Sequence, residues 1–440
     1  MIWVWIGLAL AITLFFLKGK KIQPHNLLWA FLPIDNYGIS VAGVMLKPAI
    51  IYSIFVIGYS VIAGKFKPKL TLPMIVSSML LLISIITSFV FRGNDNITSD
   101  ISAYILFFFS AVVAVCVLSL IQGRDDLRQI KDVLIATSIG YGIVFLVLFA
   151  LYKAGFSLPA VISTSENEPS VIHLFKNFTG GKLQEYIRLR GFNIDPNSSC
   201  ISFILGLTFL LSDWIKKGNP VVNTIFALII MANVVLTSSR SALIVCLMII
   251  AVSIFRLFFS TVQSRKKLIF IGTVLVIVFF IVTFAVYDSK TFSYVYDTIF
   301  TGYQNRTGLE EEYGRFSIWR EWFSLLNRSN WFYGIGYDNI SEAISQNKDA
   351  HNTFAQVLCS SGIPVGIVYI IFFLNPLGLL IKKGLRDKQN ADFLISFALA
   401  YIGLLSILLT ISYVASLYLI FFAMLLYISP GCLNRKSIGA

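Results

Sequence analysis

The sequence predicts an all-α polytopic integral membrane protein with about 12–13 transmembrane helices. Three observations lead to this fold class. The composition is apolar, because 57% of the 440 residues are hydrophobic and only 13% are charged. Apolar runs of roughly 17–21 residues, which are long enough to cross a bilayer core as helices, recur along the whole chain. Short clusters of Lys and Arg follow every second run, as the positive-inside rule requires of cytoplasmic loops.

The apolar runs place the N-terminus outside and the C-terminus inside. The candidate spans are about 2–17, 27–45, 48–64, 73–91, 101–121, 133–153, 199–215, 221–237, 241–259, 268–287, 361–381, 391–410 and 414–431. The run 27–45 contains Pro33, Asp35 and Asn36 at its centre, so a broken or re-entrant helix is the alternative there. The net charge of +13 mainly sets this topology and does not indicate nucleic-acid binding.

Two connections are long, residues 154–198 and 288–360, and both are expected on the outer side of a single integral domain over 1–440. Long loops on one face of a helical bundle often carry function. In the second loop, aromatic and apolar residues recur at helical spacing from Trp319 to Leu326. The spacing predicts an interfacial helix that is anchored by its aromatic residues. An alternative is that the same helix also directs arginines toward a site.

Arginines gather in the outer connections, where the positive-inside rule expects few. They are Arg188, Arg190, Arg240, Arg315 and Arg320. Arg240 stands between two apolar runs and so is expected near the outer interface. Any one of these arginines could extend to lipid headgroup phosphates. Five together indicate a diphosphate, because guanidinium groups pair with phosphate oxygens through two parallel hydrogen bonds.

Polar residues next to the spans complete the candidate site. Asn197 follows an Asp-Pro turn signal, and it either caps the next helix or lies on the rim of a cavity. His351 and Asn352 precede the run 361–381. A histidine there is either a packing or capping residue or a general base near neutral pH. By this topology His351 is the only histidine expected near the arginines, and Asn352 could hold it or a sugar hydroxyl.

The segments that carry these residues resemble the O-antigen ligase/polymerase superfamily of bacterial glycan-assembly proteins. The matching segments, in order, are "RLRGFNIDPNSS", "LTSSRSALI", "GRFSIWREWFSLL" with "GIGYDN", and "HNTFAQVLCSSGIPVG". The resemblance covers residues 186–366, whereas the first six spans match only in hydropathy.

The resemblance implies a helical glycosyltransferase of the GT-C type in the bacterial cytoplasmic (inner) membrane, with its active site facing the periplasm. It implies His351, Arg240 and Arg190 as catalytic residues. Arg188, Arg315, Arg320, Asn197 and Asn352 are expected to bind substrate, and which of Arg188 and Arg190 matches the family's arginine stays open. No metal and no cofactor are expected, because arginines can balance the charge of a diphosphate leaving group.

The expected function is an O-antigen or polysaccharide polymerase that uses undecaprenyl-diphosphate-linked oligosaccharides as both donor and acceptor. One alternative is an O-antigen ligase, which transfers glycan to lipid A-core. Another is a flippase for the same lipid-linked glycan, but the candidate spans contain few ionisable residues. Membrane lipid and a chain-length regulator protein are further candidate partners, and nucleic acid is not.

Overall fold

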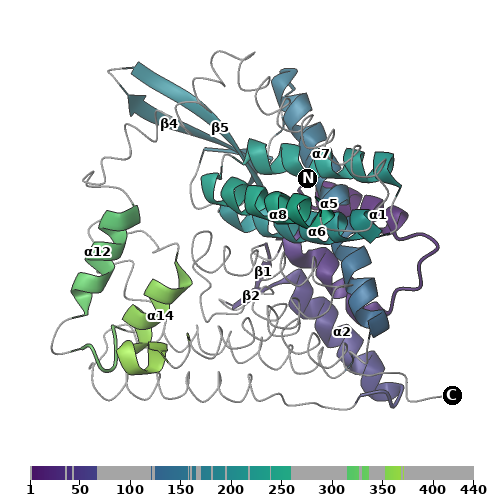
Figure 1. Cartoon of the computed structure of the whole chain (residues 1–440), viewed down its shortest axis with the longest axis horizontal. Coiled ribbons are helices and arrows are strands. Elements are labelled where there is room, and N and C mark those ends of the chain that lie inside the picture. Colours follow the sequence, from purple (N-terminus) through teal and green to yellow (C-terminus); the bar gives the residue numbers. More distant parts are fainter. Residues whose placement is uncertain are drawn as a thin grey trace. The chain divides into compact units, whose positions relative to one another are not determined.

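The protein is described from a computed structural model (Figure 1). The structure describes residues 2–34, 37–41, 44–66, 120, 124–156, 158, 161–164, 170–179, 182–193, 196–216, 219–237, 239–258, 315–326, 330–335, 352–367 and 370. These residues are mostly helical, as predicted.

The chain divides into two compact units. Unit 1 comprises Met1–Gly38, Arg128–Gln304 and Gly384–Ala400, and unit 2 comprises Ile39–Leu127, Asn305–Lys383 and Tyr401–Ala440. Two compact units can share one membrane domain, so the single domain predicted over 1–440 remains a prediction.

Six described helices coincide with predicted spans. They are α1 (Ile2–Phe16), α2 (Pro48–Ile62), α5 (Arg124–Lys153), α6 (Pro196–Lys216), α7 (Pro220–Leu236) and α8 (Arg240–Phe258). Among the described residues, one helical stretch, Arg128–Lys153, is both long and apolar enough to cross a membrane, and the other apolar helices are shorter. The predicted spans 73–91, 101–121, 268–287, 391–410 and 414–431 lie outside the described residues, apart from Leu120.

Helix α5 packs closely against three other helices of unit 1 through small residues. A Cβ atom added at Gly140 would overlap Thr13 of α1, and one added at Gly142 would lie 2.9 Å from Asn233 Nδ2 of α7. Ser138 Oγ donates a hydrogen bond of 2.7 Å to the backbone carbonyl of Ser202 in α6. Small residues at these contacts let the helix backbones approach one another.

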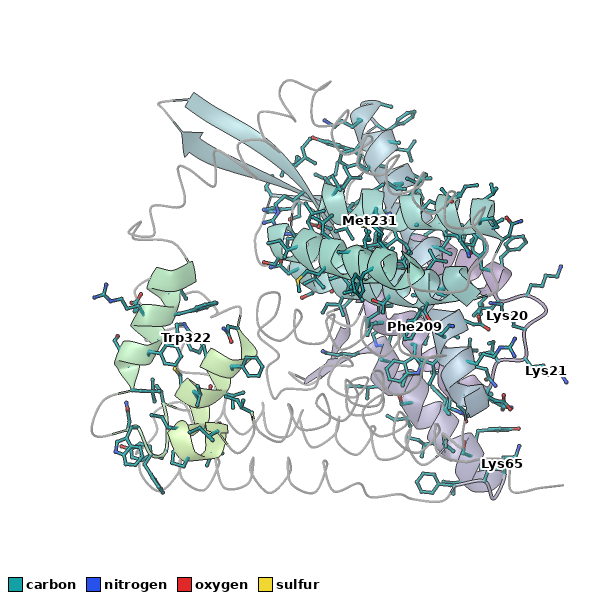
Figure 2. All side chains as sticks on the ribbon, viewed as in Figure 1. Lys20, Lys21, Lys65, Phe209, Met231 and Trp322 are labelled. Atoms are coloured by element: carbon teal, nitrogen blue, oxygen red, sulfur yellow. The ribbon has the colours of Figure 1, made fainter. Side chains whose placement is uncertain are left out.

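Two of the basic clusters lie at the same end of unit 1. Lys20, which is labelled in Figure 2, forms a salt bridge of 2.8 Å from Nζ to Asp132 Oδ1 of α5. Gln129 Oε1 accepts hydrogen bonds from Gln23 N at 2.6 Å and from Asn26 Nδ2 at 3.0 Å. The end of α1 therefore meets the start of α5, as expected if both basic clusters belong to cytoplasmic connections.

The predicted α-helical span at 27–45 is wrong. Pro24–Ile34 forms a largely buried 3₁₀ helix, η1, and an antiparallel hairpin of β1 (Ile39–Val41) and β2 (Val44–Leu46) follows. The 11 residues of η1, at about 2.0 Å each, extend about 22 Å along the bundle. Irregular backbone is tolerated inside a bundle where protein covers it, which agrees with the alternative of a broken helix.

A β-sheet lies in the predicted outer loop 154–198, so the expectation of an all-α protein is wrong at this place. The sheet contains β3 (Ile162–Ser163), β4 (Ser170–Thr179) and β5 (Lys182–Asn193), in the order β3-β4-β5. Strands β4 and β5 form a long antiparallel hairpin that extends away from the helices of unit 1 (Figure 1).

A helix is present in the second long loop as predicted, whereas its place at the membrane interface remains a prediction. It is α12 (Arg315–Leu325), and it packs against α14 (Thr353–Ser361) in unit 2. Trp322 is only 1% exposed and lies in a core with Ile318, Ala355 and Cys359, so this aromatic residue joins two helices rather than anchoring one at a surface. Of the predicted span 361–381, the structure describes Ser361, the helical residues 363–367, and residues 362 and 370.

Candidate functional site

The end of β5 carries a large bulge within the segment "RLRGFN". Leu189 pairs with Ile172 and Asn193 pairs with Ser170, so three residues of β5 oppose one residue of β4. Gly191 and Phe192 both have a positive φ, of 59° and 65°. Left-handed backbone costs about 1–2 kcal/mol at a non-glycine residue. Burial of the Phe192 ring offsets that cost, because a buried Phe side chain contributes about 1.5–3 kcal/mol.

The bulge packs against the middle of α5. The ring of Phe192 contacts the ring of Phe145 edge-on, with the centroids 5.1 Å apart. Phe145 lies 16 residues beyond Gln129, or about 24 Å along the helix. The end of β5 is therefore far along α5 from the basic clusters.

Asn193 fastens the bulge to two other elements. Its Nδ2 lies 3.0 Å from the carbonyl oxygen of Pro33 in η1, 3.3 Å from that of Gly191, and 3.0 Å from Ser199 Oγ in α6. Ser199 Oγ in turn donates to the carbonyl oxygen of Arg190. Nothing in the local sequence of Asn193 indicates contacts with residues so far away, so the residue is not recognisable as part of a site before the fold is known.

The two arginines of β5 differ in exposure. Arg188 is half-buried, and its Nε donates a hydrogen bond of 3.2 Å to the carbonyl oxygen of Thr237, directly after α7. Arg190 is 6% exposed. Strand β5 therefore brings one arginine to the connection between α7 and α8 and holds the other inside the unit.

Asn197 joins the start of α6 to the same connection. Helix α6 begins at Pro196, so Asn197 lies in its first turn and does not cap it, which was one of the two alternatives for this residue. Asn197 Oδ1 instead accepts a 2.6 Å hydrogen bond from Ser239 Oγ. Ser239 Oγ itself accepts a hydrogen bond from Ala242 N at 3.3 Å, so Ser239 caps α8.

The end of β5 and the start of α6, which adjoin in the sequence, thus meet the distant connection between α7 and α8 in unit 1. Arg188 bonds to Thr237 and Asn197 bonds to Ser239, while Arg240 follows directly as the first residue of α8. The first turns of α6 and α8 lie together, and helix N-termini favour anions. The described guanidinium group of Arg188, next to two helix N-termini, is suited to bind a phosphate group.

His173 also lies beside this site, contrary to the expectation that His351 is the only histidine near the arginines. In the β-ladder His173 pairs with Arg188, and it is 2% exposed. Directly opposed residues of an antiparallel pair have Cβ atoms about 4.5–5.5 Å apart. The hairpin brings His173 there by folding the loop back on itself, which spacing along the chain does not reveal.

The remaining candidates belong to unit 2. Asn352 caps α14, because its Oδ1 accepts hydrogen bonds from Phe354 N at 2.9 Å and Ala355 N at 3.1 Å. Arg315 is the first residue of α12, and Arg320 is exposed on the same helix. His351 lies outside the described residues, so its catalytic role stays a prediction, as does binding of a sugar by Asn352.

Two glycines join the segments "GIGYDN" and "SSGIPVG" in unit 2. Gly334 and Gly362 have φ angles of 76° and 81°, and a Cβ added at either would overlap the backbone of the other segment. Ile335 N donates to the carbonyl oxygen of Cys359 and Ile363 N to that of Trp331, both at 2.8 Å. The close approach of these backbones requires glycine at both positions.

Among the described residues, no group of three or more His, Cys, Asp and Glu side chains is arranged to hold a metal ion. Cys200, Cys246 and Cys359 are buried free thiols. Burial raises the pKa of the Cys359 thiol to about 12.

Comparison with known families identifies part of the chain. A family model described as O-antigen ligase matches residues 225–370, about a third of the chain. The match includes the Thr237–Arg240 connection, α12 and α14, and it confirms the predicted superfamily over this region. The bulged end of β5 lies before it. No curated protein sequence matches the chain.

Proposed function

Because residues 225–370 carry an O-antigen ligase region, we propose that this chain is a membrane glycosyltransferase of the GT-C type. The proposed donor is an oligosaccharide linked to undecaprenyl diphosphate at the periplasmic face of the bacterial inner membrane. The proposed acceptor is a hydroxyl group of a second lipid-linked repeat unit, which makes the chain a polysaccharide polymerase.

This proposal rests on the hydrogen bonds that join three segments of unit 1, each of which carries an arginine or begins a helix. The bonds from Arg188 to Thr237 and from Ser239 to Asn197 bring "RLRGF" and the start of α6 to the residue before Arg240. One of these segments lies inside the family match and two lie before it. Side-chain bonds between them support a single site.

The position of this site in unit 1 supports an outward orientation. The basic clusters around Lys20 and Lys131 lie at the start of α5, whereas the bulge of β5 packs much farther along that helix. If the basic end faces the cytoplasm, as the positive-inside rule requires, the arginine site is near the outer face of the membrane. A lipid-linked diphosphate has its charged group at such a depth.

The proposed reaction breaks the bond between the anomeric carbon of the donor glycan and the diphosphate. Negative charge grows on the departing phosphate, and Arg190 and Arg240 would stabilise it. Arg188, Arg315 and Arg320 are the proposed binding residues. Such electrostatic stabilisation is often the largest single contribution to catalysis. Arginines that balance this charge make a metal ion unnecessary.

His351 is the proposed general base. It would accept the proton of the acceptor hydroxyl as that oxygen attacks the anomeric carbon, a role worth roughly 10²–10⁴ in rate. The transition state would resemble an oxocarbenium ion, as in other reactions at glycosidic centres. Direct displacement predicts inversion at the anomeric carbon, which NMR coupling constants of the product would report.

A ligase is the second candidate, and the description of the matched family favours it. Ligase and polymerase use the same donor and differ in the acceptor. In a Gram-negative host, deletion of a polymerase leaves lipopolysaccharide with single repeat units. Deletion of a ligase leaves long glycan on undecaprenyl diphosphate and none on the core, so one gel separates the two functions.

The direct test uses the purified full chain in vesicles with a lipid-diphosphate-linked repeat unit as its substrate. The expected result is a longer lipid-linked glycan, and Arg188→Ala should reduce its yield. Arg128→Ala, at the far end of α5, is the matched control and should leave the yield unchanged. Movement of the substrate across the vesicle membrane without a new glycosidic bond would indicate a flippase and overturn the proposal.

A further inference from the structure

Thr237 ends α7 as its C-cap residue and is fully buried. Its backbone carbonyl oxygen accepts the 3.2 Å hydrogen bond from Arg188 Nε. The last carbonyl groups of a helix have no donor within that helix, so a basic side chain there satisfies one of them and also interacts favourably with the helix dipole. The end of α7 is therefore a suitable anchor for a guanidinium group.

The hydroxyl group of Thr237 holds this residue in place. Oγ1 donates a 2.7 Å hydrogen bond to the carbonyl oxygen of Val234 in α7 and accepts one of 3.3 Å from Ser239 N. It also lies 3.1 Å from Cys200 Sγ in α6. Because the hydroxyl hydrogen points to Val234, the thiol is the donor in this last contact. One hydroxyl group thus ties the end of α7 to α6 and to the start of the next connection.

The bond to Nε also orients the end of the Arg188 side chain. All the nitrogen atoms of a guanidinium group lie in one plane, so a fixed direction of Nε–H limits how that plane can turn. The planar fork of N–H donors is what pairs with the oxygen atoms of a phosphate. The position of the Thr237 carbonyl oxygen therefore influences where the fork of Arg188 is directed.

We propose that Thr237 is a positioning residue whose hydroxyl group keeps the guanidinium group of Arg188 in the orientation that binds the phosphate of the donor. This inference rests on the proposed function, because Arg188 is a binding residue of that same site. Thr237 is fully buried and its hydroxyl group contacts protein groups, so it acts on the substrate only through Arg188. A hydroxyl group that only stabilised the end of α7 would leave donor binding unchanged.

The first test measures binding of inorganic pyrophosphate to the purified full chain in detergent by isothermal calorimetry. Thr237→Val keeps the branched shape of the side chain but removes the hydroxyl group. It should weaken binding by about tenfold, as the loss of one charge-assisted hydrogen bond to phosphate does. Thr237→Ser, which keeps the hydroxyl group, should bind as the wild type does. Equal affinity of wild type and Thr237→Val would overturn the inference, and so would a wild type that binds no pyrophosphate.

The matched control is Thr208→Val in α6. The hydroxyl group of Thr208 is also fully buried, but it donates a 2.8 Å hydrogen bond to the carbonyl oxygen of Ile204 in its own helix. This variant should bind pyrophosphate as the wild type does. Thermal unfolding checks that each variant folds. If Thr237→Val does not fold, Thr237→Ala takes its place, with the same expected loss and the same contrary result.

A double-mutant cycle distinguishes positioning from a general effect on the fold. If Thr237 acts through Arg188, removal of its hydroxyl group should have little further effect once the guanidinium group is absent. The Arg188→Ala/Thr237→Val double variant should therefore bind pyrophosphate about as well as Arg188→Ala alone. Independent effects would multiply instead. A multiplied loss of affinity would contradict the inference, even if each single variant weakens binding.

Kinetics in vesicles then separate this inference from the proposed function. Thr237→Val should raise the KM for the lipid-diphosphate donor and leave the KM for the acceptor unchanged, while Thr237→Ser restores the wild-type value. A wild-type chain that binds pyrophosphate but forms no glycosidic bond would contradict the proposed function alone. A chain that forms product with an unaltered donor KM in Thr237→Val would contradict only the positioning role.

Discussion

Two regions of the chain carry the family's segments, and they are held together in different ways. In unit 1, side chains link β5, α6 and α8: Arg188 bonds to Thr237, and Asn197 accepts from Ser239. In unit 2, backbone contacts at Gly334 and a buried Trp322 link α12 and α14. The first region is held by polar groups of the kind that bind a charged ligand, and the second is held by packing.

Because of this difference, we expect substitutions in unit 1 to affect activity and substitutions in unit 2 to affect stability. A charged residue in unit 1 can be changed to a similar one while the apolar contacts of α5, α6 and α8 remain, so activity should respond more than stability. A glycine in unit 2 cannot gain even a methyl group without moving backbone, so stability should respond first. His351 is the exception to test, because its proposed role is chemical although it precedes α14.

The largest effect is expected for His351→Ala. Loss of the general base should lower product formation by roughly 10²–10⁴, whereas donor binding should persist because the arginines hold the diphosphate. Product yield in vesicles and binding of the lipid-diphosphate donor measure the two properties. His25→Ala, in η1 next to Asn26 and its contact with Gln129, is the control. Normal product from His351→Ala would remove the proposed base.

A smaller but still large effect is expected for Arg240→Lys. Lysine keeps the charge but loses the planar pair of donors, so the rate should fall by roughly 10–10². The control is Arg256→Lys near the other end of α8, which should retain the wild-type rate. A lowered affinity for donor should accompany the lower rate, unlike in His351→Ala. Equal rates for Arg240→Lys and wild type would contradict a bidentate contact with phosphate.

Gly334→Ala tests the packing of unit 2. The new Cβ would overlap the backbone at Ser360 and Gly362, and φ is 76°, so we expect a loss of about 2–4 kcal/mol in the free energy of unfolding. Gly58→Ala in α2 is the control, because nothing lies within 4 Å of its added Cβ. Thermal unfolding in detergent measures both. An unfolding temperature of Gly334→Ala equal to that of wild type would show that the two segments can separate freely.

Hydropathy predicted most of the described helices but not the segments that shape the site. α1, α2 and α5 to α8 coincide with apolar runs because burial in lipid or protein requires apolar residues at almost every position. The prediction of an α-helical span at 27–45 was wrong because hydropathy measures only the polarity of the side chains and not the conformation that the backbone can adopt. Pro33 would interrupt an α-helix. In the 3₁₀ helix η1 its backbone carbonyl oxygen instead accepts a hydrogen bond from Asn193 Nδ2.

The β-hairpin had a signal that hydropathy does not detect. Gly180-Gly181 stands between two stretches rich in aromatic and β-branched or aliphatic residues, which is typical of a tight hairpin. The arginines were found because charge is conspicuous in an apolar chain. Their partners Thr237, Ser239 and Asn193 were not found, because a hydroxyl or amide near a span is common and only the fold brings it to an arginine or a bulge.

Variants of Asn352 separate its role as the cap of α14 from a role in substrate binding. Asn352→Ala should lower the free energy of unfolding by about 1 kcal/mol, because two backbone N–H groups of α14 lose their acceptor. Asn352→Asp and Asn352→Ser keep an acceptor and should unfold close to wild type. If the residue also binds a sugar hydroxyl or His351, Asn352→Asp will lose activity at unchanged stability. Full activity of Asn352→Asp would leave capping as its role.

The smallest effect at neutral pH is expected from Cys359 of α14, which packs against Ile318 and Trp322 of α12. Burial raises the pKa of its thiol from 9.0 to about 12, and Sγ donates to the Trp322 carbonyl. A folded-state pKa above the unfolded value means that the neutral thiol stabilises the fold below about pH 9, and that this stability declines as the pH rises toward 12. Wild type should therefore lose more thermal stability than Cys359→Ala between pH 8 and pH 11. An equal loss of stability in wild type and Cys359→Ala over this pH range would show that α12 and α14 separate readily enough for the thiol to titrate in water. The contrast between a packed unit 2 and a polar site in unit 1 would then be weaker than the buried core indicates.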